Sequence, residues 1–164
     1  MRIRGSLIVT LILACAALTP AHAQEEEPVA PYEQSDANAG AAPITDPAVF
    51  AAFNGQDGIG RIVDRTVDLA LADAELGPIF RPFDMVRLRR TLREQFCYLL
   101  GGGCSYTGRD MNTSHADMGV ETRHFNRLVT HLRTAMREEG VPFRMQNRLL
   151  AVLAPMHRDV VQAN

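Results

Sequence analysis

Lysine is missing from this sequence, and neither sign of charge is in clear excess. All 17 basic residues among the 164 are arginines, which we interpret as a consequence of base composition, so an arginine alone does not indicate a binding site. Acidic residues number 19, and the formal net charge is −2 at pH 7. Such a chain lacks the basic excess that attracts nucleic acids and anionic membranes. We therefore expect no nucleic-acid partner.

A hydrophobic run of membrane-spanning length is also missing. The apolar run at residues 7–18 is shorter than the roughly 20 residues that a transmembrane helix needs. Arginines precede this run, and "TPAHAQ" after it offers the small residues that signal peptidase reads. The sequence therefore predicts a signal peptide at residues 1–23, export to the periplasm, and no membrane span in the mature protein. A membrane anchor and a lipid attached at Cys15 are the alternatives.

Cysteine is scarce. Removal of the signal peptide takes Cys15 away and leaves Cys97 and Cys104. A pair of cysteines in an oxidising compartment is a disulfide candidate, and the glycines of "YLLGGG" would let the chain turn back between them. Two free thiols are an equal alternative, because the sequence cannot show whether the Cα atoms approach within bridging distance. The spacing from these cysteines to His115 and His124 does not fit a zinc site.

No segment alternates between apolar and polar residues as a half-buried strand would. Residues 24–47 are acidic at their start, rich in Ala and Pro, and poor in large apolar residues, so we expect a disordered linker. Residues 48–164 should form one folded domain, and apolar residues recur in it at the three- and four-residue spacing of helices. The predicted helices cover Ile59–Leu71, Met85–Leu99, about Glu121–Glu139 and Met145–Val160, the last with a kink at Pro155. The fold class is all-α.

One connection is unusually long. Some twenty residues separate the second and third predicted helices, whereas bundle connections commonly have roughly 2–8. Within it, His115 is flanked by Met111 and Val120. Such a histidine is either a ligand or, more commonly, a hydrogen-bonded core residue. His124 and His131 lie seven residues apart among arginines on the third helix, and we expect them to face solvent.

Several segments together carry a family resemblance. In chain order they are "LALADAELGPIF", "DMVRLRRTLREQF", "LLGGG", "YTGRDM", "SHADMGV", "HFNRLVTHLRTAMREEGVP" and "LLAVLAPMHRDVV". From about residue 54 to residue 161 the chain resembles the group I truncated haemoglobins. The resemblance implies a sandwich of two helices over two around a haem b cofactor.

The resemblance also implies roles for individual residues. His115 would be the proximal ligand of the haem iron, and Phe80 would pack on the porphyrin. Further haem contacts are implied at Leu88, Leu92, Phe96, Tyr106, Met111, Val120 and Phe125.

The distal side departs from the family. Its usual tyrosine is replaced by Val67, which follows Thr66, and its usual glutamine by Leu92; Leu88 stands at the position equivalent to a distal histidine. The pocket of Thr66, Val67, Leu88 and Leu92 is therefore predicted to be apolar. A hydrogen bond to a partly charged ligand is worth about 1.5–3 kcal/mol, so its loss would weaken dioxygen binding more than that of carbon monoxide or nitric oxide.

Two further sets of residues have open roles. A donor could still be restored by Thr66, Gln95 or Tyr98. The arginines Arg87, Arg89, Arg90, Arg93 and Arg109 either pair with haem propionates or belong to a solvated charged face.

The leading functional hypothesis is reversible binding of a diatomic gas (O2, CO or NO) at a five-coordinate iron, as a carrier, scavenger or sensor. A haem enzyme, either a nitric oxide dioxygenase or a peroxidase-like protein with a redox partner, is one alternative. Dioxygenation needs a stable oxy form, which an apolar distal side disfavours. A haem-free helical interaction module is the other alternative, and an intact His115 and Phe80 argue against it.

Overall fold

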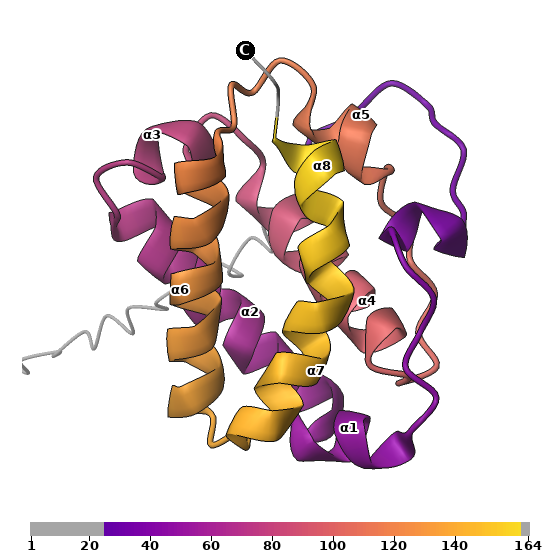
Figure 1. Ribbon diagram of the computed structural model, residues 1–164. Coiled ribbons are helices and arrows are strands. Elements are labelled where there is room, and N and C mark those ends of the chain that lie inside the picture. The colour runs from indigo at the N-terminus through magenta and orange to yellow at the C-terminus, as the bar shows by residue number, and fades with distance from the viewer. Residues whose placement is uncertain (1–24, 162–164) are drawn as a thin grey trace, which may run out of the picture.

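The computed structural model describes residues 25–161, and helices are its only regular elements in that part of the chain (Figure 1). The predicted all-α class is therefore confirmed. The elements are η1 (Asp36–Ala39), α1 (Pro47–Ala52), α2 (Gly55–Ala72), α3 (Gly77–Phe80), α4 (Met85–Leu99), α5 (Met111–His115), α6 (Thr122–Glu138), α7 (Phe143–Leu153), η2 (Ala154–Met156) and α8 (His157–Val160). The predicted signal peptide lies outside the described residues. Within residues 25–161 no helix is both long and apolar enough to cross a membrane.

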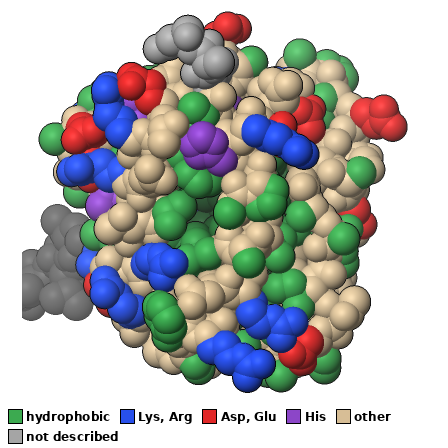
Figure 2. Space-filling view, viewed as in Figure 1, with side chains coloured by type: hydrophobic (Ala, Val, Ile, Leu, Met, Phe, Trp, Pro, Cys, Tyr) green, Lys and Arg blue, Asp and Glu red, His purple; other side chains and the backbone are tan. Residues whose placement is uncertain are grey.

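Two pairs of long helices form the body of the molecule. One pair consists of α2 and α4, and the other of α6 and the α7–α8 segment. Helix α2 packs against α6, so one pair lies across the other (Figure 1). Apolar side chains gather between α6 and α7, and charged side chains lie toward the edges of this face (Figure 2). Burial of apolar surface contributes roughly 25 cal/mol per Å². The core between the layers includes Ile59, Ile62, Val63, Val67, Phe96, Leu132, Met136 and Leu149.

Helix α4 has clear sequence signals at both ends. The Asp84 side chain accepts hydrogen bonds from two backbone N–H groups of the first turn, at 2.9 and 3.1 Å, as an N-cap residue does. After Leu99 the chain turns through Gly101, which has a φ of 79°. A Cβ atom at Gly101 would lie 2.3 Å from the carbonyl oxygen of Ile44, so only glycine fits there. Gly101 thus follows the end of α4, where the chain turns toward α5.

The fourth predicted helix is interrupted where its proline predicts a kink. Helix α7 ends at Leu153, Pro155 lies in the 3-10 turn η2, and α8 continues from His157. Proline has no N–H to donate to the preceding turn, which explains the break. Helix α8 lies beside α5.

The long connection between α4 and α6 contains a short helix that periodicity does not reveal. Asp110 caps α5, because its side chain accepts a hydrogen bond from Thr113 N at 2.9 Å. The helix ends at His115, and the chain then passes through Asp117 and Gly119, both with positive φ. The connection thus holds His115 on a helical turn.

The segment 25–46 differs from the expected disordered linker. Ala39 is fully buried, and its carbonyl oxygen accepts a hydrogen bond from Gln95 Nε2 at 3.0 Å. The side chain of Asp36 accepts from Tyr106 N at 2.7 Å. Composition suggested disorder because the segment has few large apolar residues, but backbone groups and short polar side chains make most of its contacts. The segment runs along the edge of the molecule, past α5 and down to α1 (Figure 1).

Candidate functional site

A cavity of about 350 Å³ opens between α3, α4, α5, α6 and the segment 25–46. Its wall is mostly apolar, with a few charged and hydroxyl-bearing side chains. The lining residues are Val29, Tyr32, Leu76, Ile79, Phe80, Phe83, Asp84, Arg87, Leu88, Thr91, Leu92, Gln95, Tyr106, Gly108, Arg109, Met111, Thr113, Ser114, His115, Met118, Val120, His124, Phe125, Leu128 and Val160. Concave, apolar sites with a few placed polar groups are typical of cofactor sites.

His115 reaches this cavity from the last turn of α5. Its Nδ1 lies 2.7 Å from the carbonyl oxygen of Met111, and since a carbonyl can only accept, Nδ1 carries the proton. Within residues 25–161 the ring makes no other hydrogen bond, so Nε2 keeps its lone pair. Burial lowers the pKa of His115, against the opposing effect of the Met111 hydrogen bond, and favours the neutral ring. A neutral imidazole with Nδ1–H held by a carbonyl is the form that binds a metal through Nε2.

Most of the predicted cofactor contacts lie on the wall of this cavity. The residues brought together are Phe80, Leu88, Leu92, Tyr106, Met111, His115, Val120 and Phe125. They come from α3, α4, α5, α6 and the loops around α5. The tertiary structure therefore gathers residues that are up to 45 positions apart in the chain around His115.

Three predicted residues do not line the cavity. Phe96, 6 % exposed, lies one helical turn beyond Leu92 and packs into the core with Val67. Val67 has no exposed surface, because its side of α2 is covered by the neighbouring helices. The hydroxyl of Thr66 donates to the carbonyl oxygen of Ile62 at 2.7 Å and is buried. The distal part of the wall is thus formed from α4, not from α2.

The hydroxyl and amide donors that α4 places on the wall are already engaged by backbone carbonyls. Thr91 donates to the carbonyl oxygens of Arg87 and Leu88, at 3.0 and 3.2 Å. Gln95 Nε2 donates to the N-terminal segment, as described above. The two uncharged polar side chains of α4 therefore direct these hydrogen bonds to backbone carbonyls and not into the cavity.

Tyr106 follows the same pattern on the other side of the cavity. Its hydroxyl donates to the carbonyl oxygen of Arg109 at 3.0 Å. Burial raises the pKa of Tyr106 to about 12, so the phenol stays protonated at physiological pH.

Among the wall residues that sequence reasoning missed, three are informative. His124 was expected to face solvent, but it is 9 % exposed, and its Nδ1 accepts from Glu121 N at 3.1 Å as part of a capping box at the start of α6. The acidic residue three positions before it was a usable signal for such a cap. Val29 and Tyr32 come from the segment 25–46, and no sequence pattern marked them.

His131 was also expected to face solvent, and this expectation is wrong. Its Nε2 lies 2.8 Å from a carboxylate oxygen of Asp73, at the end of α2. Asp73 is buried and also accepts from Arg127 Nε at 2.5 Å. These contacts tie α2 to α6 and lie outside the cavity wall.

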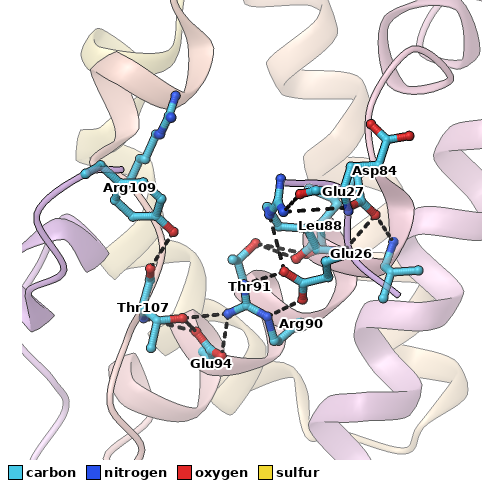
Figure 3. Close-up of polar contacts among 12 residues, drawn as sticks. Glu26, Glu27, Asp84, Leu88, Arg90, Thr91, Glu94, Thr107 and Arg109 are labelled. Carbon is cyan, nitrogen blue, oxygen red and sulfur yellow. Dashed lines mark hydrogen bonds and ion pairs between the residues drawn. The ribbon is translucent and has the colours of Figure 1, made fainter. Parts of the chain in front are cut away.

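The five arginines considered for propionate binding lie in three different settings. Arg87 and Arg109 line the cavity. Arg89 and Arg93 instead form ion pairs with Asp64 on α2, at 3.1 and 2.6 Å. Arg90 lies between Glu26 on one side and Glu94 and Thr107 on the other (Figure 3). The cavity therefore offers two arginines directly, at its mouth.

Cys97 and Cys104 form a disulfide, with their Cα atoms 5.7 Å apart. The sequence left this bridge and two free thiols equally open. The bridge joins the last turn of α4 to the loop that leads to α5. Gly102 lies against it, since a Cβ atom there would be 2.7 Å from Cys97 Sγ.

The cavity fits a haem in its chemistry. A flat apolar macrocycle matches the apolar wall, its iron matches the neutral imidazole of His115, and its two carboxylates match Arg87 and Arg109 on the wall. Within the described residues no group of three or more His, Cys, Asp or Glu side chains is placed to hold a metal ion.

Comparison with known proteins gives the same result. Residues 48–162 match the family model of bacterial-like globins. The chain is 29 % identical over 113 residues to a group 1 truncated hemoglobin of Mycolicibacterium paratuberculosis, covering 69 % of this chain and 83 % of that protein. It is 32 % identical over 89 residues to a group 1 truncated hemoglobin of Nostoc commune, covering 54 % and 75 %.

A solved structure shows the same fold. The truncated hemoglobin of Tetrahymena pyriformis in its Fe(III) form superposes with a TM-score of 0.67 at 23 % identity, covering 70 % of this chain and 98 % of that one. The expected sandwich of two helices over two is thereby confirmed. The chain belongs to the bacterial-like globin family, and haem is its cofactor.

Proposed function

We propose that His115 holds the haem iron and that the protein reversibly binds a diatomic gas in the space beside Leu88 and Leu92. One observation carries this proposal: the Nδ1–H of His115 is held by the Met111 carbonyl at 2.7 Å, which leaves Nε2 as the ligand atom. Membership of the globin family supports it.

Haem supplies an iron with a position open to a small gas molecule. The chain's own residues orient and enclose it. Phe80 and Phe125 offer aromatic contact surfaces, and Arg87 and Arg109 stand at the mouth for its carboxylates. Apolar walls of this kind exclude water from the gas site.

The proposed ligand preference follows from the wall on α4. Leu88 and Leu92 offer no hydrogen bond, and the donors of Thr91 and Gln95 are engaged by backbone carbonyls. Dioxygen depends most on such a donor, because it is the most polarised of the three gases when bound. We therefore propose that carbon monoxide and nitric oxide are held better, relative to dioxygen, than in relatives with a polar distal group.

The decisive experiment compares two histidines of the same wall. Absorption spectra of the haem-supplied full chain are recorded after reduction and addition of carbon monoxide, for the wild type, His115→Ala and His124→Ala. The wild type and His124→Ala should give a sharp, shifted Soret band, and His115→Ala should lose it. If the band is lost in His124→Ala and kept in His115→Ala, then His124 holds the iron and the proposed assignment is wrong. Free-haem absorbance in the wild type would contradict the proposed function.

We also propose that the protein is exported and works in the periplasm. The arginines and apolar run at residues 2–18 support this, and so does a disulfide between Cys97 and Cys104, since such bonds persist in oxidising compartments. Fractionation of cells that produce the full chain, with N-terminal sequencing of the product, tests it. A periplasmic product beginning at residue 24 is expected, and a cytoplasmic product with residues 1–23 intact would contradict it.

A further inference from the structure

The segment of residues 26–32, which we call the N-terminal strap, lies along the haem cavity. Two strap residues, Val29 and Tyr32, form part of the cavity wall. The Tyr32 hydroxyl donates to the carbonyl oxygen of Thr107 at 2.8 Å, and the Arg109 guanidinium lies over the Tyr32 ring, 4.9 Å from its centre. Arg109 also donates to the strap carbonyl of Ala30 at 3.2 Å. One of the two cavity arginines is therefore held by the strap.

The other cavity arginine is held by the strap as well. Arg87 Nε lies 3.3 Å from a carboxylate oxygen of Glu26, and Arg87 Nη2 donates to the carbonyl oxygen of Glu27. In return, the backbone N–H of Glu27 donates to the Asp84 carboxylate at 2.8 Å. The strap thus contacts both the cationic and the anionic group at the start of α4.

Arg90 also holds the strap, through the Glu26 carboxylate. The Arg90 guanidinium donates hydrogen bonds to the Glu26 carboxylate from Nε and Nη2, the latter at 3.0 Å. Its Nη1 donates to Glu94 at 2.8 Å and to Thr107 at 2.5 Å (Figure 3). All three guanidinium nitrogens of Arg90 are engaged. The Arg90 hydrogen bond is the largest cause that lowers the pKa of Glu26, so its carboxylate is ionised at neutral pH.

A haem carries two carboxylates of the same charge and shape as the Glu26 side chain. A carboxylate that approached Arg87 while Glu26 stayed in place would meet a like charge a few ångströms away, and no guanidinium nitrogen of Arg90 would be available to it. Exchange of one carboxylate for the other conserves the ion pairing of Arg87. The strap would lose its contacts with Arg87 in that exchange.

We propose that Glu26 competes with a haem propionate for Arg87, and that a propionate bound to Arg87 displaces Glu26 and releases the strap. The proposal rests on the proposed function, because it needs haem in this cavity. It assigns the acidic start of the segment a role in haem uptake. In this proposal the strap opens when a tetrapyrrole carboxylate replaces the Glu26 carboxylate on Arg87.

The first test measures haemin association with the apoprotein of the full chain by stopped flow. Glu26→Gln removes the competing charge and should accelerate haemin association about two- to fivefold, the range of a partly exposed ion pair. Glu33→Gln is the matched control, since it removes the same charge from the same segment, and its carboxylate forms no ion pair within the described residues. Haemin dimethyl ester, which lacks the propionate charges, should show no difference between Glu26→Gln and the wild type.

A second test needs no variant. Hydrogen exchange of the strap amides in the wild type should become faster when haemin is added, because the strap is released. Slower exchange would mean that the strap closes over the haem with Glu26 in place, and this would overturn the proposal. Equal haemin rates for Glu26→Gln and Glu33→Gln, or an equal acceleration with the dimethyl ester, would overturn it too. If neither haemin nor its ester binds any of these proteins, the proposed function itself fails.

Discussion

The ring of His115 is fixed by its own helical turn, because its Nδ1 lies 2.7 Å from the carbonyl oxygen of Met111 four residues earlier. Helix α5 has only five residues, yet this contact sets both the tautomer and the direction of the ring. A short capped turn is thus sufficient to present a ligand atom to the cavity.

The His115 site should accept an external ligand in place of its own side chain. His115→Gly removes the ring but leaves the helix and the cavity wall, so the carbon monoxide Soret band should be lost and then return when imidazole is added. Titration of imidazole against the reduced, haem-supplied variant measures this. No recovery at saturating imidazole, with an unchanged circular dichroism spectrum, would show that another group holds the iron.

Adding a hydrogen-bond donor at Leu92 should stabilise bound dioxygen. Leu92→Gln places a side-chain amide on this wall, and a bond of about 1.5–3 kcal/mol would slow dioxygen dissociation roughly ten- to a hundredfold. The rate is measured by stopped-flow displacement of dioxygen from the reduced protein. Leu92→Met, of similar size and without a donor, should leave the rate nearly unchanged. A similar slowing in both variants would point to packing instead.

The disulfide should stabilise the fold. It closes a loop across a sequence separation of seven residues, for which the chain-entropy model gives about 2–3 kcal/mol. A reductant should therefore lower the thermal midpoint of the wild type by roughly 5–10 °C. The Cys97→Ser, Cys104→Ser double variant should already melt at the lower temperature and ignore the reductant. A reductant effect of equal size in the double variant would contradict this assignment.

Asp73 should make the fold sensitive to acid. Burial opposes ionisation of this carboxyl, but hydrogen bonds from Arg127, His131 and backbone N–H groups outweigh it and hold its pKa well below the usual range. A carboxyl with a depressed pKa stabilises the folded state above its ordinary pKa near 4, and this contribution is lost as the pH falls below that value.

The matching variant is Asp73→Asn, which should lower the free energy of unfolding by about 1–3 kcal/mol at pH 7 and flatten its dependence on pH below 5. Denaturant titrations at several pH values measure both quantities. Asp159→Asn is the control, because Asp159 is more exposed and, within residues 25–161, forms an ion pair with the adjacent Arg158 alone. If the free energy of unfolding of Asp73→Asn depends on pH in the same way as that of the wild type, Asp73 is not a cause of the acid sensitivity.

Local signals predicted much of the helical framework. The Asp84 cap and the glycines after Leu99 mark the ends of α4 correctly, and Pro155 marks the break after α7. The short helix α5 escaped because five residues are too few for periodicity to show. His124 escaped because a capping histidine among arginines has the pattern of an exposed helix face.

The sequence by itself determined the helical class, the position of His115 in a long connection, and the apolar residues at Leu88 and Leu92, since spacing and residue type depend on the chain alone. Only the tertiary structure decided that Phe96 and Val67 lie in the core, that Cys97 meets Cys104, and that the segment 25–46 packs on the cavity mouth. These outcomes depend on the direction in which each helix turns its faces and on contacts between residues far apart in the chain. The pairing of Glu26 with Arg87 and Arg90, more than 60 positions away, leaves no trace in local composition.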